Sequence, residues 1–482
     1  MMKIFERLLV FASLAAICLP SEAKKTDFKN SVGMRYLNES FAVYDALQKS
    51  IHGFAEPGYL EYKSSKAIAD HLQAAGFQVE WGVADIPTAF IATFGEGSPV
   101  IGLLGEYDAL PGMSQDTSSV EHPLVEGAAG HGCGHNLLGT GPAAAAVAIS
   151  KWLAEGHTGT IKYFGCPAEE GGGGKAYMTK AGCFKGCDAF FDWHPSNGNS
   201  VSTATGLANV RVRFSFHGIP SHASVSPWKG RSALDAVEAF NYMMNLMREH
   251  VPTDARIHYI IDNGGMAPNV VPAEASCLYY IRHPKAETVL QILERAKKAA
   301  EGAALGTGTT MSYEVMNGNY ERLTNEVLSE VMLRSLKSVG GVRLDAREKA
   351  FCAEVMRNSD LSEDCSNFEI VRQEIHRGFS GGSSDVGNVS QIGPLVNFAI
   401  ATGPAACSLH SWQQTAIGGT TVGTKSLITV AKVEYLAALE LFTHPETVKA
   451  AWDEYYSKRG HDFKFVPLMG NRKPPLDYCK GK

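Results

Sequence analysis

The chain has 482 residues, 45% of them hydrophobic and 20% charged, and its formal net charge is −6. This balance is typical of a soluble globular protein with a large core, and it excludes a fibrous or mostly disordered chain. The mildly acidic charge without a basic block argues against nucleic acid as a partner. Ten cysteines are too few for a disulfide scaffold.

The N-terminus has the pattern of a secretory signal peptide. Two basic residues precede an apolar run from Leu8 to Leu19, and Ser21 and Ala23 fit the −3 and −1 positions of a cleavage site. The run is too short to span a bilayer, and no later segment reaches 18 uninterrupted apolar residues. We therefore expect residues 1–23 to be cleaved and the protein to be exported, periplasmic or secreted, without a membrane span. A lipoprotein signal ending at Cys18 is the alternative, which the bulky residue before it disfavours.

The next part of the chain predicts an α/β fold. Residues 31–76 have the apolar spacing of helices, and Gly76 is a plausible stop. Strand-like apolar runs follow at 99–104, 159–165, 188–192 and 395–401. Helical or glycine-rich stretches separate three of these runs, which favours a mixed, mostly parallel sheet flanked by helices on both faces.

Residues 207–318 have their own order of strand-like and helical segments. Strand-like alternation leads to a helix, then to two more strand-like runs, a second helix and a last strand. This β-α-β-β-α-β order predicts a small domain for dimerisation or as a lid, inserted into a catalytic domain made of residues 24–206 and 319–482. Residues 341–375 are polar and poor in strands, and they look like a surface excursion. The proline-rich tail from Lys464 is expected to wrap around the surface.

Polar side chains follow each strand-like run of the predicted parallel sheet. In such a sheet, ligands bind at the carboxyl ends of the strands. Five clusters are of this kind, because the segment GHGCGHN also opens a helical stretch. The candidate residues are Glu106 and Asp108, Cys133 and His135, Glu169 and Glu170, His194, and His410.

Cys133 and His135 form the most informative pair. They are two residues apart, which in extended backbone places both side chains on one side. A thiolate and an imidazole are strong donors for zinc-like ions. A buried cysteine beside a surface histidine would be the usual reading of a lone pair, but the four other clusters favour a metal site. His131 is an alternative ligand that ranks below His135.

Glu169 and Glu170 are adjacent, so their side chains point in different directions. One carboxylate can then bind a metal while the other acts as base on the attacking water. The glycine run that follows resembles a phosphate-binding loop, but that motif requires Gly at 169 and Ser or Thr at 176, which is Ala176. His194 and His410 are the remaining ligand candidates, although a single histidine after a strand is more often structural.

The predicted inserted domain carries three further candidates. His222 and Asn269 are each expected at a tip made otherwise of small residues. Arg282 ends a predicted strand, where it can bind a substrate carboxylate bidentately. In the main domain, Asp108 is expected to orient a ligand histidine from behind, while the use of Glu106 stays open.

The motifs GEYDALPG, HGCGHNLLGT, CPAEEGG, WHP, GIPSHAS, GGMAPNVVPAEA and LHSWQ occur in this order. In this order and spacing, the chain resembles the co-catalytic-metal aminoacylase/carboxypeptidase amidohydrolases, from about residue 35 to about residue 442. The resemblance implies that two divalent ions, zinc or manganese, are held by Cys133, His135, Glu170, His194 and His410.

The same resemblance implies roles for the other candidates. Glu169 would be the general base, Asn269 would help to bind substrate, and His222 would stabilise the oxyanion from the insert of a partner protomer. The substrate would be an N-acyl amino acid. GHN and GEYD point towards an aroyl-glutamate such as p-aminobenzoyl-glutamate. The protein would be a homodimer, or a heteromer with a related subunit.

Other interpretations remain. An aminoacylase or dipeptidase of the same family would use the same residues. Ser380 lies in a G-x-S-x-G match, but the sequence after it is a poor helix, which disfavours a serine hydrolase. A secreted metal-cleft binding protein without turnover is a different class, and the presence of Glu169 argues against it. Cys183 with Cys187, and Cys352 with Cys365, are close enough in sequence to form disulfides.

Overall fold

The computed structural model describes residues 28–480, so the expected signal peptide (residues 1–23) lies outside the described residues. The N-terminal part is helical, as expected, but it is divided into three helices. These are α1 (Val32–Glu39), α2 (Phe41–Phe54) and α3 (Tyr62–Ala74). The chain leaves α2 at Ala55, whose φ of 45° lies in the left-handed region. A loop with Pro57 then reverses its direction.

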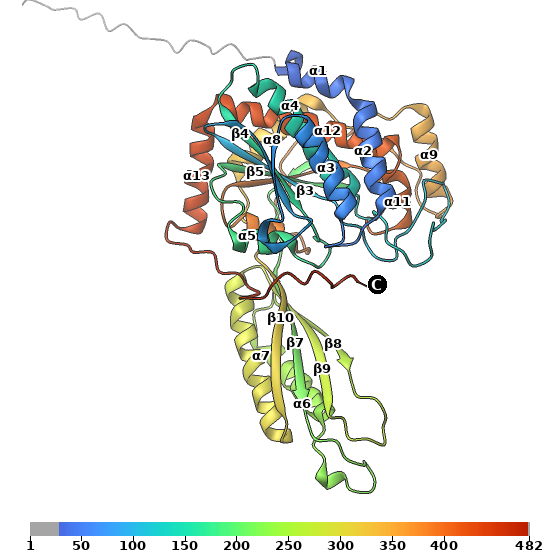
Figure 1. The fold of residues 1–482 in the computed structure, drawn as a ribbon, viewed down its shortest axis with the longest axis vertical. Helices are drawn as coiled ribbons and strands as arrows, with labels where there is room; N and C mark the ends of the chain where they lie inside the picture. Colours follow the sequence, from blue (N-terminus) through green and yellow to red (C-terminus); the bar gives the residue numbers. More distant parts are fainter. Residues whose placement is uncertain (1–27, 481–482) are drawn as a thin grey trace, which may run out of the picture.

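The main sheet has seven strands in the order β1-β2-β4-β3-β5-β11-β6 (Figure 1). Its centre, β4-β3-β5-β11, is parallel, and the strands at both edges are antiparallel. The bounds are β1 Gln78–Trp81, β2 Phe90–Glu96, β3 Val100–Glu106, β4 Gly159–Cys166, β5 Ala189–Ser196, β6 Ser200–Ser202 and β11 Leu395–Ala401.

Helices cover both faces of this sheet, which confirms the expected fold class. Leu103 packs into the core under α4, whereas the next residue, Leu104, packs into a second core on the opposite face. This alternation follows from the two-residue period of a strand. The first face is covered mainly by α4 (His135–Leu153), α8 (Glu326–Val339) and α12 (Thr421–Thr443), and the second by α5 (Gly174–Ala181) and α10 (Val386–Val389). Further helices are α9 (Ala346–Arg357), α11 (Trp412–Gly418) and α13 (Pro445–Arg459).

A second sheet projects from the main body as a separate lobe (Figure 1). Its order is β10-β7-β9-β8, with every neighbouring pair antiparallel. Along the chain the lobe reads β7, α6, β8, β9, α7, β10, which is the expected β-α-β-β-α-β order. Its own core lies between the sheet and the two helices. The bounds are β7 Ala208–His217, α6 Ala233–Met247, β8 Arg256–Asn263, β9 Glu274–His283, α7 Ala286–Thr307 and β10 Thr310–Asn319.

Part of residues 341–375 is buried in the main core, although the sequence of this segment is polar. The prediction that it is a surface segment is therefore wrong. They contain helix α9, whose inner face places Cys352, Val355 and Met356 in the main core. Apolar residues at helical spacing were hidden among polar ones. The tail beyond Lys464 crosses between the body and the lobe (Figure 1), and Arg472 in it pairs with Glu314 of β10 at 2.7 Å. None of the helices in residues 28–480 has the length and apolar character needed to cross a bilayer.

Candidate metal centre

The carboxyl edge of the parallel strands gathers the candidate residues. Strands β3, β4 and β5 end close to the residues predicted from their sequence positions, and the loop after β11 carries His410. Helix α4 begins at His135 on the same side. Gly134 takes φ +74°, so the chain turns sharply between Cys133 and His135. The two side chains therefore converge through a tight turn, and not through the extended segment that their spacing suggested.

Two donor groups meet at Cys133. One ligand atom from each of Cys133, His135 and His194 lies within 4.8 Å of the others, and the same holds for Cys133, Glu170 and His410. Cys133 Sγ is 3.6 Å from His194 Nε2, and His410 Nε2 is 3.2 Å from Glu170 Oε1. All five residues expected to bind metal are thus in one cluster.

Buried atoms without a well-aligned hydrogen bond indicate that this cluster fits divalent ions. His135 Nε2, Glu170 Oε1 and Glu106 Oε2 are buried without a well-aligned hydrogen bond in the described residues. Their nearest charged neighbours are one another or another candidate ligand: His135 Nε2 is 3.3 Å from Glu106 Oε2, and Glu170 Oε1 is 3.2 Å from His410 Nε2. Leaving a buried polar atom unsatisfied costs about 1–3 kcal/mol, and more for a charged group. A thiolate, three imidazoles and a carboxylate are suitable donors for zinc-like ions. The residues present therefore fit a pair of such ions.

The electrostatics keep Cys133 in the form that binds metal. Burial raises the pKa of Cys133, but the imidazoles of His135 and His194 outweigh burial and bring this pKa down to about 6. Burial lowers the pKa of His194, and the neighbouring thiolate reverses the shift and raises it to about 9. The thiolate is the metal-binding form of cysteine.

Asp108 contacts two of the candidate ligand residues on the side away from the donor cluster. Its Oδ1 lies 3.0 Å from His135 Nδ1, and its Oδ2 accepts a 2.9 Å hydrogen bond from the backbone N–H of Glu170. A carboxylate on the far nitrogen of a histidine fixes the ring and leaves the other nitrogen for a metal. His131 points elsewhere, with its Nε2 at 3.1 Å from the carbonyl of Ile51, and it belongs to neither donor group.

Glu169 faces a different side of the cluster from Glu170. Its carboxylate lies within 4.8 Å of donor atoms of Glu106 and His135. Burial, and then the charges of Glu106 and Asp385, raise the pKa of Glu169 well above the ordinary range. A carboxyl group with a raised pKa holds a proton more readily, which suits both steps of acid–base catalysis, taking up a proton and returning it.

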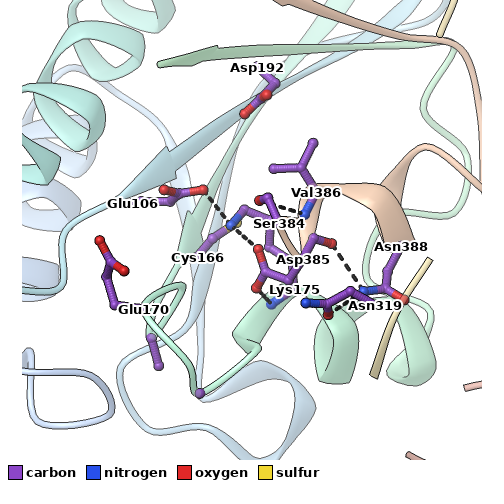
Figure 2. Close-up of polar contacts among 12 residues, drawn as sticks. Glu106, Cys166, Glu170, Lys175, Asp192, Asn319, Ser384, Asp385, Val386 and Asn388 are labelled. Atoms are coloured by element: carbon purple, nitrogen blue, oxygen red, sulfur yellow. Dashed lines mark hydrogen bonds and ion pairs between the residues drawn. The ribbon is translucent and has the colours of Figure 1, made fainter. Parts of the chain in front are cut away.

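A buried ionic cluster supports this arrangement, and the sequence reasoning missed it (Figure 2). Lys175 Nζ lies 2.5 Å from Glu106 Oε1 and 2.6 Å from Asp385 Oδ1, and the Lys175 side chain is fully buried. The backbone N–H of Lys175 also donates to Asp385 Oδ2 at 2.9 Å. One signal was available. Lys175 is in the first turn of α5, where the helix dipole disfavours a cation, so a dedicated acidic partner was to be expected.

The inserted lobe keeps its two tip residues away from this cluster. His222 pairs with Val270 through the backbone, and the carbonyl of Asn269 accepts a 3.1 Å hydrogen bond from Ala223 N. Both loops lie at the end of the second sheet that points away from the main body (Figure 1). His222 and Asn269 are therefore together, but the protomer's own donor cluster is at the other end.

Arg282 is at the near end of the lobe. It lines a cavity of about 670 Å³ together with Arg256, His258 and Phe379. Its Nε is buried without a hydrogen-bond partner in the described residues. The structure thus separates Arg282 from the other two candidates of the lobe and places it where the lobe joins the body.

The structure also bears on two further points of the sequence analysis, the serine hydrolase motif and the possible disulfides. Ser380 lies in a loop, and the next helix, α10, begins only at Val386, so the strand–turn–helix of a serine hydrolase is not formed around it. The cysteine pairs that the sequence spacing allowed, 183 with 187 and 352 with 365, are present as thiols.

The two-lobed α/β fold and the cysteine–histidine–glutamate cluster together define a hydrolase of the metallopeptidase class. Residues 102–411 match the model of peptidase family M20/M25/M40. The chain belongs to this family, whose members hydrolyse amide and peptide bonds.

Three comparisons describe its neighbours. The chain is 37% identical over 464 residues to one of the subunits of p-aminobenzoyl-glutamate hydrolase of Escherichia coli, covering 89% of this chain and 95% of that protein. It is 27% identical to mouse Xaa-Arg dipeptidase, covering 88% and 91%. The fold is similar to a Bacillus subtilis protein described as a dinuclear metal binding peptidase from the M20 family, with a TM-score of 0.52, 18% identity, and coverage of 82% and 99%.

Proposed function

We propose that this chain is a metal-dependent amidohydrolase that cleaves the amide bond of N-acyl glutamates, with p-aminobenzoyl-glutamate as its substrate. The observation that carries the proposal is the pair of donor groups sharing Cys133, with the carboxyl group of Glu169 beside them. The 37% identical relative supports the choice of substrate. An aminoacylase or dipeptidase activity on other substrates is the alternative, as is a binding protein that has kept the cleft without turnover.

The residues divide the work. Cys133, His135 and His194 would hold one divalent ion, zinc or manganese, and Cys133, Glu170 and His410 the other. Such a pair supplies positive charge that acidifies a water and polarises an amide carbonyl. Asp108 keeps the His135 ring in place through its 3.0 Å contact with Nδ1.

Glu169 moves the proton. It removes a proton from the attacking water as the C–O bond forms, and it returns this proton to the nitrogen as the C–N bond breaks. The products are a free carboxylic acid and a free amino acid. His222 from a partner protomer would donate to the oxyanion of the tetrahedral intermediate, and Asn269 would contact the same substrate.

The assembly and the location follow from the same proposal. A second copy of the chain, or a related subunit, would bring its lobe over the donor cluster. Strand β8 is at the edge of the lobe sheet, and its Ile260 and Ile261 are 61% and 44% exposed, which suits pairing with another edge. The signal-like N-terminus supports export to the periplasm or the medium.

The test is a substrate panel on protein purified with its metals retained. We expect release of p-aminobenzoate from p-aminobenzoyl-glutamate at a higher kcat/KM than from the aspartate analogue or from dipeptides ending in arginine. Glu169→Gln, prepared in parallel, controls for contaminating hydrolases. Faster cleavage of the dipeptides would favour the dipeptidase alternative, and no turnover of any member by metal-loaded protein would favour the binding protein.

A further inference from the structure

We propose that Arg322 selects the acidic residue of the substrate, by binding the side-chain carboxylate of its C-terminal glutamate in the cavity beside His194. The inference rests on the proposed function and adds the residue that sets its specificity. Arg322 lies just after β10, where the chain returns from the lobe to the main body.

The cavity is part of the same cleft as the donor cluster. It has a volume of about 410 Å³, and Glu106 and His194 are among its lining residues. Arg322 and Tyr320 form another part of its wall, together with the loop from Ser380 to Gly387. A substrate whose amide lies at the donor cluster can therefore place a side chain against Arg322.

Arg322 makes no direct ion pair with any carboxylate of the described residues. Its only hydrogen bond among the described residues is a long one of 3.4 Å, from Nη2 to the carbonyl of Ala204, and Nε is buried without any partner. No carboxylate oxygen of residues 28–480 lies within 4.0 Å of its nitrogens. Asp192, on the same cavity wall, acts on the charge of Arg322 without contacting it directly. Because Nε is buried and unpaired, an anion that enters the cavity and contacts the guanidinium is stabilised.

The acidic groups of the cavity are already engaged. Glu106 Oε1 is held by Lys175, and its Oε2 faces His135 Nε2 of the donor cluster at 3.3 Å. Asp192 Oδ2 accepts a 2.5 Å hydrogen bond from Asn397 Nδ2. Ser383 Oγ, by contrast, is a second buried donor of the wall, after Arg322 Nε, that has no hydrogen-bond partner in the described residues. Apart from Glu106 Oε2, which faces the donor cluster, the buried unpaired atoms of this wall among the described residues are hydrogen-bond donors, which match a carboxylate and not a cationic side chain.

A second cationic group is placed for the other carboxylate of glutamate. The cavity with Arg282 adjoins the first, because Leu207 lines both. Arg256 stands directly opposite Arg282 in the pairing of β8 with β9. The α-carboxylate at Arg282 and the side-chain carboxylate at Arg322 would fix both ends of a glutamate. An arginine side chain in the first cavity would meet a like charge.

The test compares selectivity, not activity alone. The wild-type protein, Arg322→Gln and Arg322→Lys are assayed with p-aminobenzoyl-glutamate, its neutral glutamine analogue and its arginine analogue. Arg377→Gln is the matched control, because Arg377 is an exposed arginine that pairs with Glu326 at 2.9 Å outside the cavity. Bound metal per chain and thermal unfolding are measured for each variant.

We expect Arg322→Gln to lower the glutamate-to-glutamine ratio of kcat/KM on the order of 100-fold, because a site built to bind a charged group discriminates strongly. Most of the loss should be in KM for the glutamate substrate, with metal content unchanged. Arg322→Lys should give a ratio between those of the wild type and Arg322→Gln, since lysine keeps the positive charge but cannot bind a carboxylate bidentately. This variant also keeps the test valid if Arg322→Gln does not fold. Arg377→Gln should keep the wild-type ratio.

The experiment distinguishes failure of the inference on Arg322 from failure of the proposed function. If the wild type cleaves p-aminobenzoyl-glutamate and both Arg322 variants keep the wild-type ratio, the inference on Arg322 is overturned while the proposed function stands. A wild-type preference for the arginine analogue would also overturn it, and would assign the cavity to Asp192. If metal-loaded wild type cleaves none of the three, the proposed function fails and the inference with it.

Discussion

At the scale of single residues, Glu169 and Glu170 are neighbours in the chain with different surroundings. Glu170 faces Cys133 and His410, whereas Glu169 faces Glu106 and His135. The proposed division of labour predicts that Glu169→Gln lowers kcat by about 10²–10⁴-fold, the usual contribution of a general base, while the metal content stays at the wild-type level. Glu170→Ala should lose activity together with at least one ion. Elemental analysis and steady-state kinetics on the same samples measure both quantities.

A wild-type kcat in Glu169→Gln would remove Glu169 from the role of base. Glutamine has nearly the same shape, so a change in packing does not account for the expected loss. Metal lost from Glu169→Gln but retained in Glu170→Ala would reverse the two assignments.

Cys133 allows a separate test of the donor set. It is 5% exposed and has a pKa of about 6, so it is a thiolate at neutral pH. We expect a chelator to expose it to alkylation and the metal-loaded protein to resist, because a coordinated thiolate is not available as a nucleophile. Peptide mapping after iodoacetamide treatment measures the difference. Cys187, also buried but with a pKa raised by burial to about 12, is the control and should stay unmodified in both forms. Equal labelling of Cys133 in both forms would exclude it as a ligand.

The sequence predicted the donors of this cluster for a simple reason. Few residue types bind metal, and each candidate follows a strand or opens a helix, where parallel strands bring distant segments to one edge. Lys175, Asp385 and Arg322 could not be predicted in the same way. The contact between Lys175 and Asp385 joins positions 210 residues apart, and a charged residue alone does not show whether it will be buried.

At the scale of elements, the contacts of Lys175 fix two short helices against the sheet. Lys175 is in α5, Asp385 precedes α10, and Glu106 ends β3. Replacing Lys175 by Met leaves two buried carboxylates without their counter-charge. Removing one partner of a buried ion pair typically costs about 3–5 kcal/mol of unfolding free energy. Denaturant unfolding of the metal-free protein measures this change.

Lys180→Met is the matched control, because Lys180 is an exposed lysine of the same helix whose Nζ donates a 3.2 Å hydrogen bond to the carbonyl of Arg472. Its effect should be within about 0.5 kcal/mol, as for most surface substitutions. Adding Glu106→Gln to Lys175→Met should recover part of the loss, since one of the two stranded charges is removed. Equal stability of Lys175→Met and Lys180→Met would show that the buried cluster contributes little.

The central strands could be predicted closely. The runs at 99–104, 159–165 and 395–401 correspond to β3, β4 and β11, because a buried strand is a short, continuous apolar run. The edge strands β1 and β6 were missed, since they are short, and β1 is mostly exposed and carries no such run. Helix α9 was missed because its few buried residues alternate with charged residues of the exposed face, so the segment reads as polar.

At the scale of the whole molecule, the tip of the lobe can act on the donor cluster of its own chain or on that of a partner protomer. His222 and Asn269 are on loops that lie next to each other, through the bridge between His222 and Val270. These loops are at the end of the lobe sheet that points away from the main body (Figure 1). We predict that His222 acts on the site of a partner protomer. His222→Ala and Glu169→Gln are each expected to be inactive, and refolding them together should restore activity.

The expected recovery is about a quarter of the wild-type activity. Random pairing gives about half mixed dimers, and each of these has one site with neither lesion. Differential tags verify that mixed dimers form. Mixed dimers without activity would mean that His222 acts within its own chain or has no catalytic role, and refolded His222→Ala alone is the baseline.

The central claim is that two ions held around Cys133 make this chain a hydrolase of aroyl-glutamates, and a metal titration tests it most directly. Protein stripped with a chelator is titrated with zinc or manganese while p-aminobenzoyl-glutamate cleavage and bound metal are followed together. The proposal predicts no activity in the stripped protein and a plateau at two ions per chain, with no activity in Glu169→Gln at the same loading. Full activity in the stripped protein, or two ions bound without any cleavage, would contradict it.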